Sequence, residues 1–301
     1  RYGRDVAGAL QIWDAFDPSE PRTPETRAVS DAEIADMFDE VRTNPLGNKG
    51  RRRLSSLAGV QDKVLLARVD GEWAEPLDGF PSTHILKPLS GRHRSLIFDE
   101  EFGSRFARGL DLAAFDTRID EFAGRSALVV ERYDRDGDLG RVHQEDFNQV
   151  LGHRGDGKYE QPPGDDRLRA IAGVLREHAT AREMRKLAKM TTLSLALGNL
   201  DMHAKNISVL HTEGGEIRLA PMYDVVPQLH MDVDHEVALL VDGKADYFAI
   251  DGADLLAEVT SWGLRDARRL IAEALELTQE IAAAQSPLPG ADPSLVPTIQ
   301  H

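Results

Sequence analysis

The sequence predicts an α+β fold with two lobes, the first rich in β-strands and the second mainly helical. Short runs of β-branched and apolar residues, bounded by turn dipeptides such as Asp70-Gly71 and Asp78-Gly79, occupy much of the region up to residue 135, and such runs are typical of paired strands. Beyond residue 140, apolar residues recur at helical spacing over long segments. The length of 301 residues exceeds that of one ordinary domain and fits two lobes.

The first half is expected to begin with a helix. Ser30 and Glu33 have the spacing of a capping box, and apolar residues follow at helical intervals through to Thr43. The apolar runs and turn residues that come next predict three strands and one helix. In chain order these elements are strands over 64–69 and 83–87, a helix over 97–110 and a strand over 127–133.

The second half is expected to consist of helices interrupted by one short hairpin. Gly198 follows a long helical pattern and suits the position just after a helix C-terminus. The hairpin is predicted around the turn Glu213-Gly214-Gly215, and the last sixteen residues, from 286, are expected to be a tail. The predicted helices are 145–151, 167–178, 181–197, 252–262 and 265–284, and the hairpin strands are 206–211 and 216–220.

Three segments are therefore expected along the chain. Residues 1–28 are interpreted as the remnant of an N-terminal subdomain with a connector, because the chain begins inside a domain-like pattern and residues 14–28 carry three prolines. Residues 29–135 are expected to form the β-rich lobe and residues 136–301 the helical lobe. A portion of the protein before Arg1 is expected to be missing from the sequence.

The composition argues against several classes of protein. Apolar residues make up 41% and charged residues 29%, which disfavours collagen-like, disordered and membrane proteins. The net charge of −15 disfavours direct attraction to nucleic-acid phosphates. The absence of cysteine excludes a disulfide framework, a thiolate nucleophile and a cysteine-ligated zinc site. No run of apolar residues is long enough for a membrane span, and no signal-peptide pattern is present, so a cytoplasmic location is expected.

The most informative polar segment lies between a predicted helix and a predicted strand. Asp201 and Asn206 have the five-residue spacing of a protein-kinase catalytic loop, in which the Asp acts on the attacking hydroxyl and the Asn binds Mg²⁺. Lys205 would neutralise charge on the transferred phosphoryl group. Asp224 follows the predicted hairpin at the position of a second metal ligand. Each residue alone also fits a polar loop or turn, so the combination carries the prediction.

A kinase also needs a lysine for the nucleotide phosphates. Lys87 ends a predicted strand in the β-rich half, and Glu100 and Glu101 on the following helix are both available as its acidic partner. The two strongest phosphate-loop signatures, G-x-x-x-x-G-K-[ST] and G-x-G-x-x-G before Lys87, are absent. The sequence LSSLAGVQDK, over residues 54–63, occupies the place before the first strand instead.

That stretch resembles the S-x-A-G-x-Q-x-K segment of the HipA family of toxin-antitoxin serine/threonine kinases. Five further segments are similar to motifs of the same family, in the same order from about residue 50 to 250. They are THILK at 83–87, VERYDR at 130–135, HQED at 143–146, the D-x-H-x-K-N loop at 201–206 and PMYDV at 221–225. The resemblance implies a bilobal protein-kinase-like fold whose β-rich lobe binds the nucleotide and whose helical lobe is catalytic.

The resemblance also implies roles for individual residues. Asp201 would be the catalytic base with Lys205 beside it, and ATP and Mg²⁺ would be the cofactors. His203 is grouped with the nucleotide-binding residues, and bracing of the catalytic loop is its alternative role. The Mg²⁺ ligands would be Asn206 and Asp224, and the ATP-binding residues would be Lys87, the backbone from Glu131 to Tyr133, and Ser56, Ala58, Gly59, Gln61 and Lys63 of the loop that covers the phosphates.

The function implied is that of a growth-inhibiting kinase toxin. In the family, the typical partner is a small helix-turn-helix antitoxin of HipB type, so contact with DNA would be indirect, and protein substrates include aminoacyl-tRNA synthetases. The serine at the position of Ser56 can be autophosphorylated in the family, with Ser55 as the neighbouring competitor here. A phosphate dianion next to the ATP phosphates would oppose nucleotide binding.

Two other classes of function remain open at this stage. A metal-dependent hydrolase would use Asp201, His203, Asp224 and the run His230 to Glu236, because mixtures of histidine and carboxylate bind transition metals. In the kinase interpretation His230 and His235 are ordinary surface or loop residues. The other class is an inactive kinase-like binding protein. Phosphate transfer abolished by Asp201→Asn would separate the kinase from both.

Overall fold

The computed structural model describes residues 3–48, 55–57, 61–91, 93–137, 139–153, 159–160, 164 and 166–300, with only the backbone described at 55, 56 and 300. Two compact units account for the chain: 1–97 with 115–144, and 98–114 with 145–301. The sequence-based division lay at 135/136, and it did not place the helix after residue 97 with the helical part of the chain.

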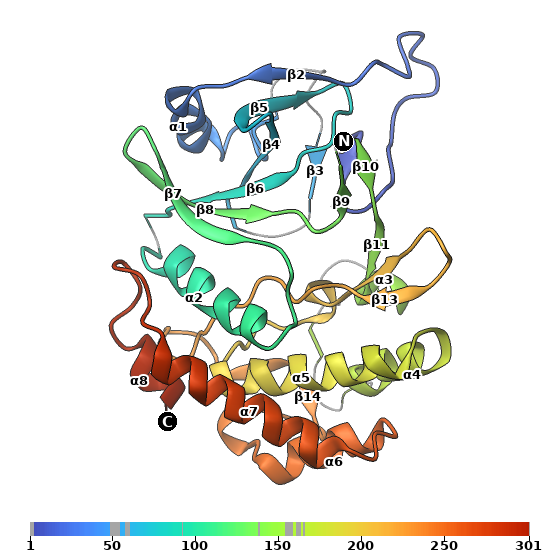
Figure 1. The fold of residues 1–301 in the computed structure, drawn as a ribbon, viewed down its shortest axis with the longest axis vertical. Helices are drawn as coiled ribbons and strands as arrows, with labels where there is room; N and C mark the ends of the chain where they lie inside the picture. The colour runs from blue at the N-terminus through green and yellow to red at the C-terminus, as the bar shows by residue number, and fades with distance from the viewer. Residues whose placement is uncertain are drawn as a thin grey trace. The chain divides into compact units, whose positions relative to one another are not determined.

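A six-stranded antiparallel sheet forms the body of the first unit (Figure 1). Helix α1 (Asp31–Glu40) begins at the predicted capping box and packs Ile34, Met37 and Phe38 into the core of this unit with side chains of the sheet. The strands, in their order across the sheet, are β2 (Glu25–Ala28), β5 (Glu72–Leu77), β4 (Val64–Val69), β6 (His84–Pro88), β8 (Arg125–Glu131) and β7 (Thr117–Phe122). Two small two-stranded sheets complete the described part: β1 (Asp5–Val6) with β3 (Ser55–Ser56), and β9 (Arg135–Asp136) with β10 (Gly140–Arg141).

Buried ion pairs attach the N-terminal segment to the end of β8. Arg135 donates to Asp5 at 2.8 Å, and Arg132 donates to both oxygens of Asp134, at 3.0 and 2.8 Å. Asp134 also accepts from the backbone N–H of Gly8 at 2.7 Å. The guanidinium groups hold the pKa values of Asp5 and Asp134 below the usual range despite burial. The first residues of the chain are therefore an integral part of this unit.

The second unit is mainly helical. Its longest helices are α5 (Ala181–Leu197) and α7 (Ala267–Ala284), which pack against each other (Figure 1). The other helices are α2 (Leu96–Gly109), α3 (Phe147–Val150), α4 (Arg167–His178), α6 (Gly252–Ser261) and α8 (Leu295–Gln300), with short 3₁₀ turns η1 (Ala204–Asn206) and η2 (Tyr247–Ala249). The strands are β11 (His143–Asp146), β12 (Ser208–His211) and β13 (Ile217–Leu219) in one sheet, and β14 (Glu236–Val241) with β15 (Lys244–Asp246) in another.

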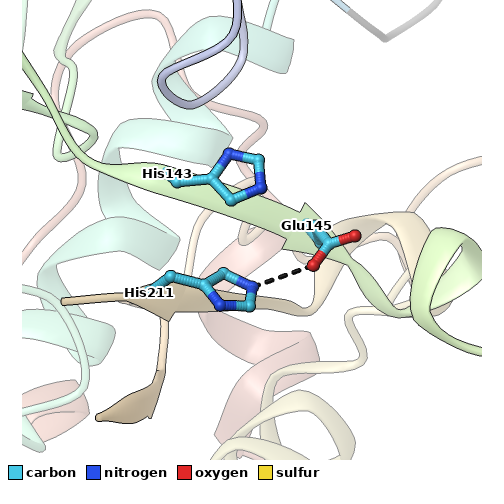
Figure 2. Close-up of side chains that lie close together, drawn as sticks. All are labelled: His143, Glu145 and His211. Carbon is cyan, nitrogen blue, oxygen red and sulfur yellow. Dashed lines mark hydrogen bonds and ion pairs between the residues drawn. The ribbon is translucent and has the colours of Figure 1, made fainter. Parts of the chain in front are cut away.

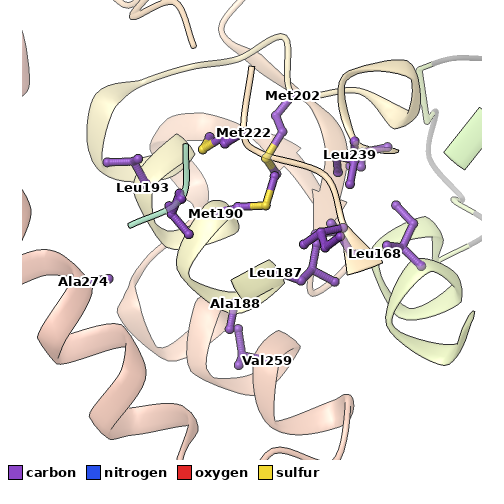
Figure 3. Close-up of a cluster of buried hydrophobic side chains, with 14 of the residues drawn as sticks. Leu168, Leu187, Ala188, Met190, Leu193, Met202, Met222, Leu239, Val259 and Ala274 are labelled. Carbon is purple, nitrogen blue, oxygen red and sulfur yellow. The ribbon is translucent and has the colours of Figure 1, made fainter. Parts of the chain in front are cut away.

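The core of the second unit includes residues from its polar loops as well as from its helices. Met202 and Met222 come from the two loops that carry Asp201 and Asp224, and both belong to the same buried cluster as Met190 of α5 (Figure 3). The hydroxyl of Ser194 lies 3.0 Å from the sulfur of Met202. Burying the apolar neighbour of Asp201 and of Asp224 fixes each loop on the helical scaffold.

Several sequence-based assignments need correction. Residues 25–28, expected to be part of a connector, form edge strand β2, and 143–146 form strand β11 before the short helix α3. The expected tail contains α8, whose Leu295 is fully buried. Strands β5, β7, β14 and β15 were not predicted. Among the described residues, no helix has the length and apolarity needed to cross a membrane.

Candidate active site

The loop that carries Asp201 starts where α5 ends. Gly198 adopts the left-handed conformation (φ 62°), which terminates the helix as its sequence position predicts. Gln228 then bonds the loop from two sides: its backbone N–H donates to the carbonyl of Gly198 at 2.9 Å, and its side-chain oxygen accepts from the N–H of Leu200 at 3.1 Å. The loop therefore leaves the helix in a fixed direction.

Hydrogen bonds within the loop hold Asp201 and Asn206 together. The side-chain amide of Asn206 donates to the backbone carbonyl of Asp201 at 2.9 Å, and the N–H of His203 donates to the same carbonyl at 2.8 Å. The carboxylate of Asp201 is 40% exposed, whereas the His203 side chain is only 6% exposed. Asp201 can therefore meet a reactant, and the burial of His203 fits bracing of the loop better than contact with a nucleotide.

A tyrosine connects this loop to the segment that carries Asp224. Tyr223 donates its phenolic hydrogen to the carbonyl of Lys205 at 2.7 Å, and its oxygen also lies 2.7 Å from the hydroxyl of Ser208. Asp224 itself has a left-handed backbone (φ 53°), which is costly for a residue with a Cβ and persists where the surroundings demand it. The structure thus brings the loops of Asp201, Lys205, Asn206 and Asp224 together in one unit.

Helix α2 makes a close approach to the same segment. A Cβ added at Gly103 would lie 2.2 Å from the carbonyl oxygen of Val225, so only glycine permits this contact. On the same helix, Glu101 binds Arg105 through two hydrogen bonds of 2.8 and 2.7 Å. Both Glu101 and its neighbour Glu100, the two candidate partners of a phosphate-binding lysine, are buried.

The remaining predicted residues belong to the first unit. Lys87 lies in the central strand β6 opposite Leu128 and is 4% exposed, and Lys63 is 6% exposed. A buried ammonium group is stable only with an anionic or polar partner, so both positions suit residues that bind phosphate. Gln61 and Tyr133 are half-buried and Glu131 is exposed. Ala58 and Gly59 lie outside the described residues, and of Ser56 only the backbone is described, paired with Val6.

Asn206 and Asp224 offer oxygen atoms that suit a hard divalent cation. Because the amide nitrogen of Asn206 is used by the carbonyl of Asp201, its side-chain oxygen is the atom left to act as a ligand. Asp224 supplies a carboxylate, and Mg²⁺ prefers such oxygen ligands completed by water and phosphate.

Histidine and carboxylate ligands suited to a transition metal occur elsewhere. Among the described residues, one group of three qualifies: His143, Glu145 and His211, with the Nε2 of His211 at 2.8 Å from Glu145 (Figure 2). The hydrolase interpretation is not supported by this arrangement, because its residues are absent from the group. His230 lies in a loop, as the kinase interpretation expects, but its side chain is only 2% exposed and is bonded to the buried Asp99 at 3.2 Å.

A comparison with models of protein families shows which family this chain is related to. The model of the HipA-like C-terminal domain matches residues 55–285. The chain belongs to the HipA family. The resemblance deduced from the short motifs is thereby confirmed, and the matched range includes both β6 and the loops of Asp201 and Asp224.

Relatives of known sequence include proteins named as kinases. The chain is 35% identical to "Putative kinase Y4mE" of Sinorhizobium fredii, over 94% of this chain and 70% of Y4mE. It is 30% identical to the serine/threonine-protein kinase toxin HipA of Shewanella oneidensis, over 87% of this chain and 63% of that protein. The chain therefore spans roughly two thirds of the length of these HipA-family relatives.

Solved structures confirm the kinase-like fold. HipA from the complex of HipA, HipB and operator DNA of Shewanella oneidensis matches with a TM-score of 0.74 and 26% identity, over 99% of this chain and 74% of that one. The proinflammatory kinase CtkA of Helicobacter pylori matches with a TM-score of 0.54 and 16% identity, over 81% of this chain and 86% of that one, and this likeness concerns the fold alone.

Sequence reasoning missed two tyrosines of this HipA-family site. Tyr223 was quoted only as part of a motif, and Tyr159, which donates to Asp201 at 2.9 Å, was not considered at all. Tyr223 directly precedes Asp224, so its place in the sequence could have marked it as a site residue. Tyr159 lies 42 residues before Asp201, and no local pattern connects positions so far apart.

Proposed function

We propose that this HipA-family chain is an ATP-dependent serine/threonine protein kinase. The observation that carries the proposal is a pair of hydrogen bonds: Asn206 donates to the backbone carbonyl of Asp201, and Tyr223, the residue before Asp224, donates to the carbonyl of Lys205. A base, a cation and two oxygen ligands on adjoining loops are the parts that phosphoryl transfer needs. The relatives named as kinases support the same conclusion.

In the proposed reaction, the oxygen of a serine or threonine side chain attacks the γ-phosphorus of ATP. The new O–P bond forms as the bond to the β-phosphate oxygen breaks, and ADP leaves. Asp201 accepts the hydroxyl hydrogen bond and orients the nucleophile, and the proton leaves through this carboxylate. Lys205 compensates negative charge on the transferred group. Lys87 would bind nucleotide phosphate, with Glu100 or Glu101 as its acidic partner.

Asn206 and Asp224 would hold Mg²⁺ through oxygen atoms. When bound, this ion neutralises charge on the phosphate oxygens. The backbone between Glu131 and Tyr133 would hydrogen-bond adenine, and residues 56–63 would cover the phosphates, with Ser56 as the site of inhibitory self-phosphorylation.

The proposal extends to the biological role. The chain would act in the cytoplasm as a toxin that phosphorylates a cellular protein and inhibits growth, with an aminoacyl-tRNA synthetase as the candidate substrate class. A HipB-type helix-turn-helix antitoxin would be its partner. The structural relative was solved in a complex with HipB and operator DNA, and the net charge of −15 suits a protein that meets DNA only through such a partner.

The test is transfer of labelled phosphate. The chain is incubated with γ-labelled ATP, Mg²⁺ and cell extract, and labelled proteins are identified by phosphoproteomics. We expect Asp201→Asn to lower the rate of transfer by at least about 100-fold, because the amide cannot accept the proton. Asp36→Asn is the matched control, since Asp36 is exposed on helix α1, and it should label like the wild type.

Two results would contradict the proposal. No transfer by the wild type, to itself or to any extract protein, would favour an inactive binding protein. Transfer that survives Asp201→Asn would remove this residue from the reaction. A hydrolase would instead release product without labelling protein and would depend on a transition metal.

A further inference from the structure

Tyr159 contacts the catalytic loop although the proposed reaction assigns it no part. Its phenolic hydroxyl donates to Oδ1 of Asp201 at 2.9 Å, and its ring meets the ring of His203 edge-on at 5.4 Å. His203 in turn places its Nε2 3.9 Å from Oδ2, the other carboxylate oxygen. The two oxygens of Asp201 therefore have different surroundings: Oδ1 accepts a hydrogen bond from the phenol, and Oδ2 lies on the side of the imidazole.

The position of Tyr159 is fixed by its neighbour in sequence. Glu160 is 3% exposed, and its carboxylate accepts from the backbone N–H groups of Leu240 at 3.0 Å and Arg167 at 3.3 Å. Its own N–H donates to the carbonyl of Ala238 at 2.9 Å. These bonds fasten the backbone next to Tyr159 to strand β14 and to the first residue of α4.

The same strand also holds the residue before Asp201. The N–H of Ala238 donates to the carbonyl of Leu200 at 2.9 Å, while its carbonyl accepts from Glu160. Ala238 thus bridges the residue after Tyr159 and the residue before Asp201. Two hydrogen bonds to one strand residue set the separation of the two backbones, so the contact between phenol and carboxylate is built into the fold.

The Tyr159 hydroxyl is suited to donate its hydrogen bond to Asp201 at all times. Burial, the charge of Asp201 and the hydrogen bond raise the pKa of Tyr159 to about 12, so the phenol keeps its proton at neutral and mildly alkaline pH. A carboxylate with one oxygen engaged has a restricted rotation and presents its other oxygen in a defined direction. Such preorganisation is effective in catalysis, because it costs no rearrangement during the reaction.

We propose that Tyr159 is a positioning residue that orients the carboxylate of Asp201 toward the substrate hydroxyl. This inference rests on the proposed function, in which Asp201 is the base. It assigns a task to a segment that lies outside the motifs of the loop itself.

The first experiment measures rate. Tyr159→Phe removes the hydroxyl and keeps the ring against His203, so we expect the rate of label transfer at saturating ATP to fall about 10-fold, with the half-saturating ATP concentration unchanged within about twofold. Tyr247→Phe is the matched control: it loses a hydroxyl bond of 2.9 Å to the carbonyl of Leu195, and its rate and half-saturating ATP concentration should stay those of the wild type.

The second experiment does not depend on activity. Tyrosinate absorbance at 295 nm is measured at pH 10.5, and the signal of Tyr159 is taken as the difference between a protein and its Tyr159→Phe form. We expect a larger fraction of Tyr159 to be ionised in Asp201→Asn than in the wild type, because the variant lacks the carboxylate charge whereas burial acts in both proteins.

The outcomes separate the two proposals. An active wild type, an inactive Asp201→Asn and an unchanged Tyr159→Phe would overturn the positioning role alone, as would equal losses in Tyr159→Phe and Tyr247→Phe. Equal ionisation of Tyr159 in wild type and Asp201→Asn would also overturn it. An inactive wild type with the expected absorbance change would instead refute the proposed function and, with it, any role of Tyr159 in the reaction.

Discussion

The backbone of Asp224 shows what the surroundings of a single residue can impose. A left-handed φ of 53° costs an L-residue about 1–2 kcal/mol, and the bonds of Tyr223 on one side and the close approach of Gly103 to Val225 on the other hold the segment in place. A glycine would accept this backbone more easily but could not supply a carboxylate.

His84 gives a prediction at the same scale. Burial and the nearby Arg118 and Arg68 lower the pKa of His84 to about 4, below the ordinary value of about 6.5 for an unfolded chain. The folded state therefore disfavours the charged form. Between pH 6.5 and pH 4 the unfolded chain binds a proton at His84 that the folded protein does not. The free energy of unfolding is therefore highest above pH 6.5 and falls as the pH falls toward 4.

The measurement is urea unfolding at pH 7.5, 6.0 and 5.0. We expect His84→Gln to reduce the loss of unfolding free energy over this range by roughly 1–2 kcal/mol, because it removes a group that must charge on acidification. His178→Gln is the control, since His178 is half-exposed at the end of α4. Parallel pH curves for wild type and His84→Gln would contradict the prediction.

At the scale of elements, the pairing of β1 with β3 connects the N-terminal segment to the segment of Ser56. Asp5 pairs with Ser55 and Val6 with Ser56 in parallel register, and Asp5 is itself held by Arg135. A phosphate at Ser56 would add about two negative charges close to the backbone of this strand pair. Phosphorylation of Ser56 would therefore affect the pairing of β3 with β1 as well as the side chain of Ser56 itself.

The expected result is that Ser56→Ala cannot label itself at this position, keeps its activity longer on incubation with ATP and arrests growth more strongly than the wild type. The physical reason is that the inhibitory dianion no longer forms. Mass spectrometry of the incubated protein and growth curves provide the measurements. Ser55→Ala is the matched control, and self-labelling that persists in Ser56→Ala but is lost in Ser55→Ala would transfer the role to Ser55.

Helix α2 belongs to a different unit from the strands that flank it in the sequence. It lies between strands of the first unit but groups with the second, and its Asp99 accepts from the backbone of Asp292 at 3.1 Å and bonds the buried His230. These contacts explain why an acidic helix residue and a histidine after Asp224 are both buried. They also tie the last part of the chain to the segment near the candidate site.

At the scale of the whole molecule, that last part contributes to the core of the second unit. Leu295 of α8 is fully buried in the core cluster, and Phe98 lies so close to Gly290 that a Cβ there would clash with the ring. We expect Leu295→Ala to lower the free energy of unfolding by about 2–4 kcal/mol through the cavity it leaves. Leu275→Ala, at a position that is 38% exposed, should cost much less. Equal effects in urea unfolding would show that α8 does not stabilise the unit.

The local elements and the order of the motifs could be predicted from the amino-acid sequence alone. The helices 167–178 and 181–197 and the strand 64–69 were predicted with the bounds that the structure has, because capping residues, Gly198 and the periodicity of apolar residues act over a few positions. The family resemblance rested on motifs that are likewise short. Both kinds of signal are readable without knowing what packs against them.

Contacts between residues far apart along the chain could be identified only from the folded structure. Tyr159 and Asp201 are 42 positions apart, His230 and Asp99 are 131 apart, and Asp292 and Asp99 are 193 apart. Edge strand β2 pairs with β5, and helix α8 buries Leu295 in the core of the second unit, but their local sequence patterns are weak and indicated a connector and a tail. The physical reason is that burial and hydrogen bonding between distant segments depend on the whole packed arrangement, which no window of neighbouring residues contains.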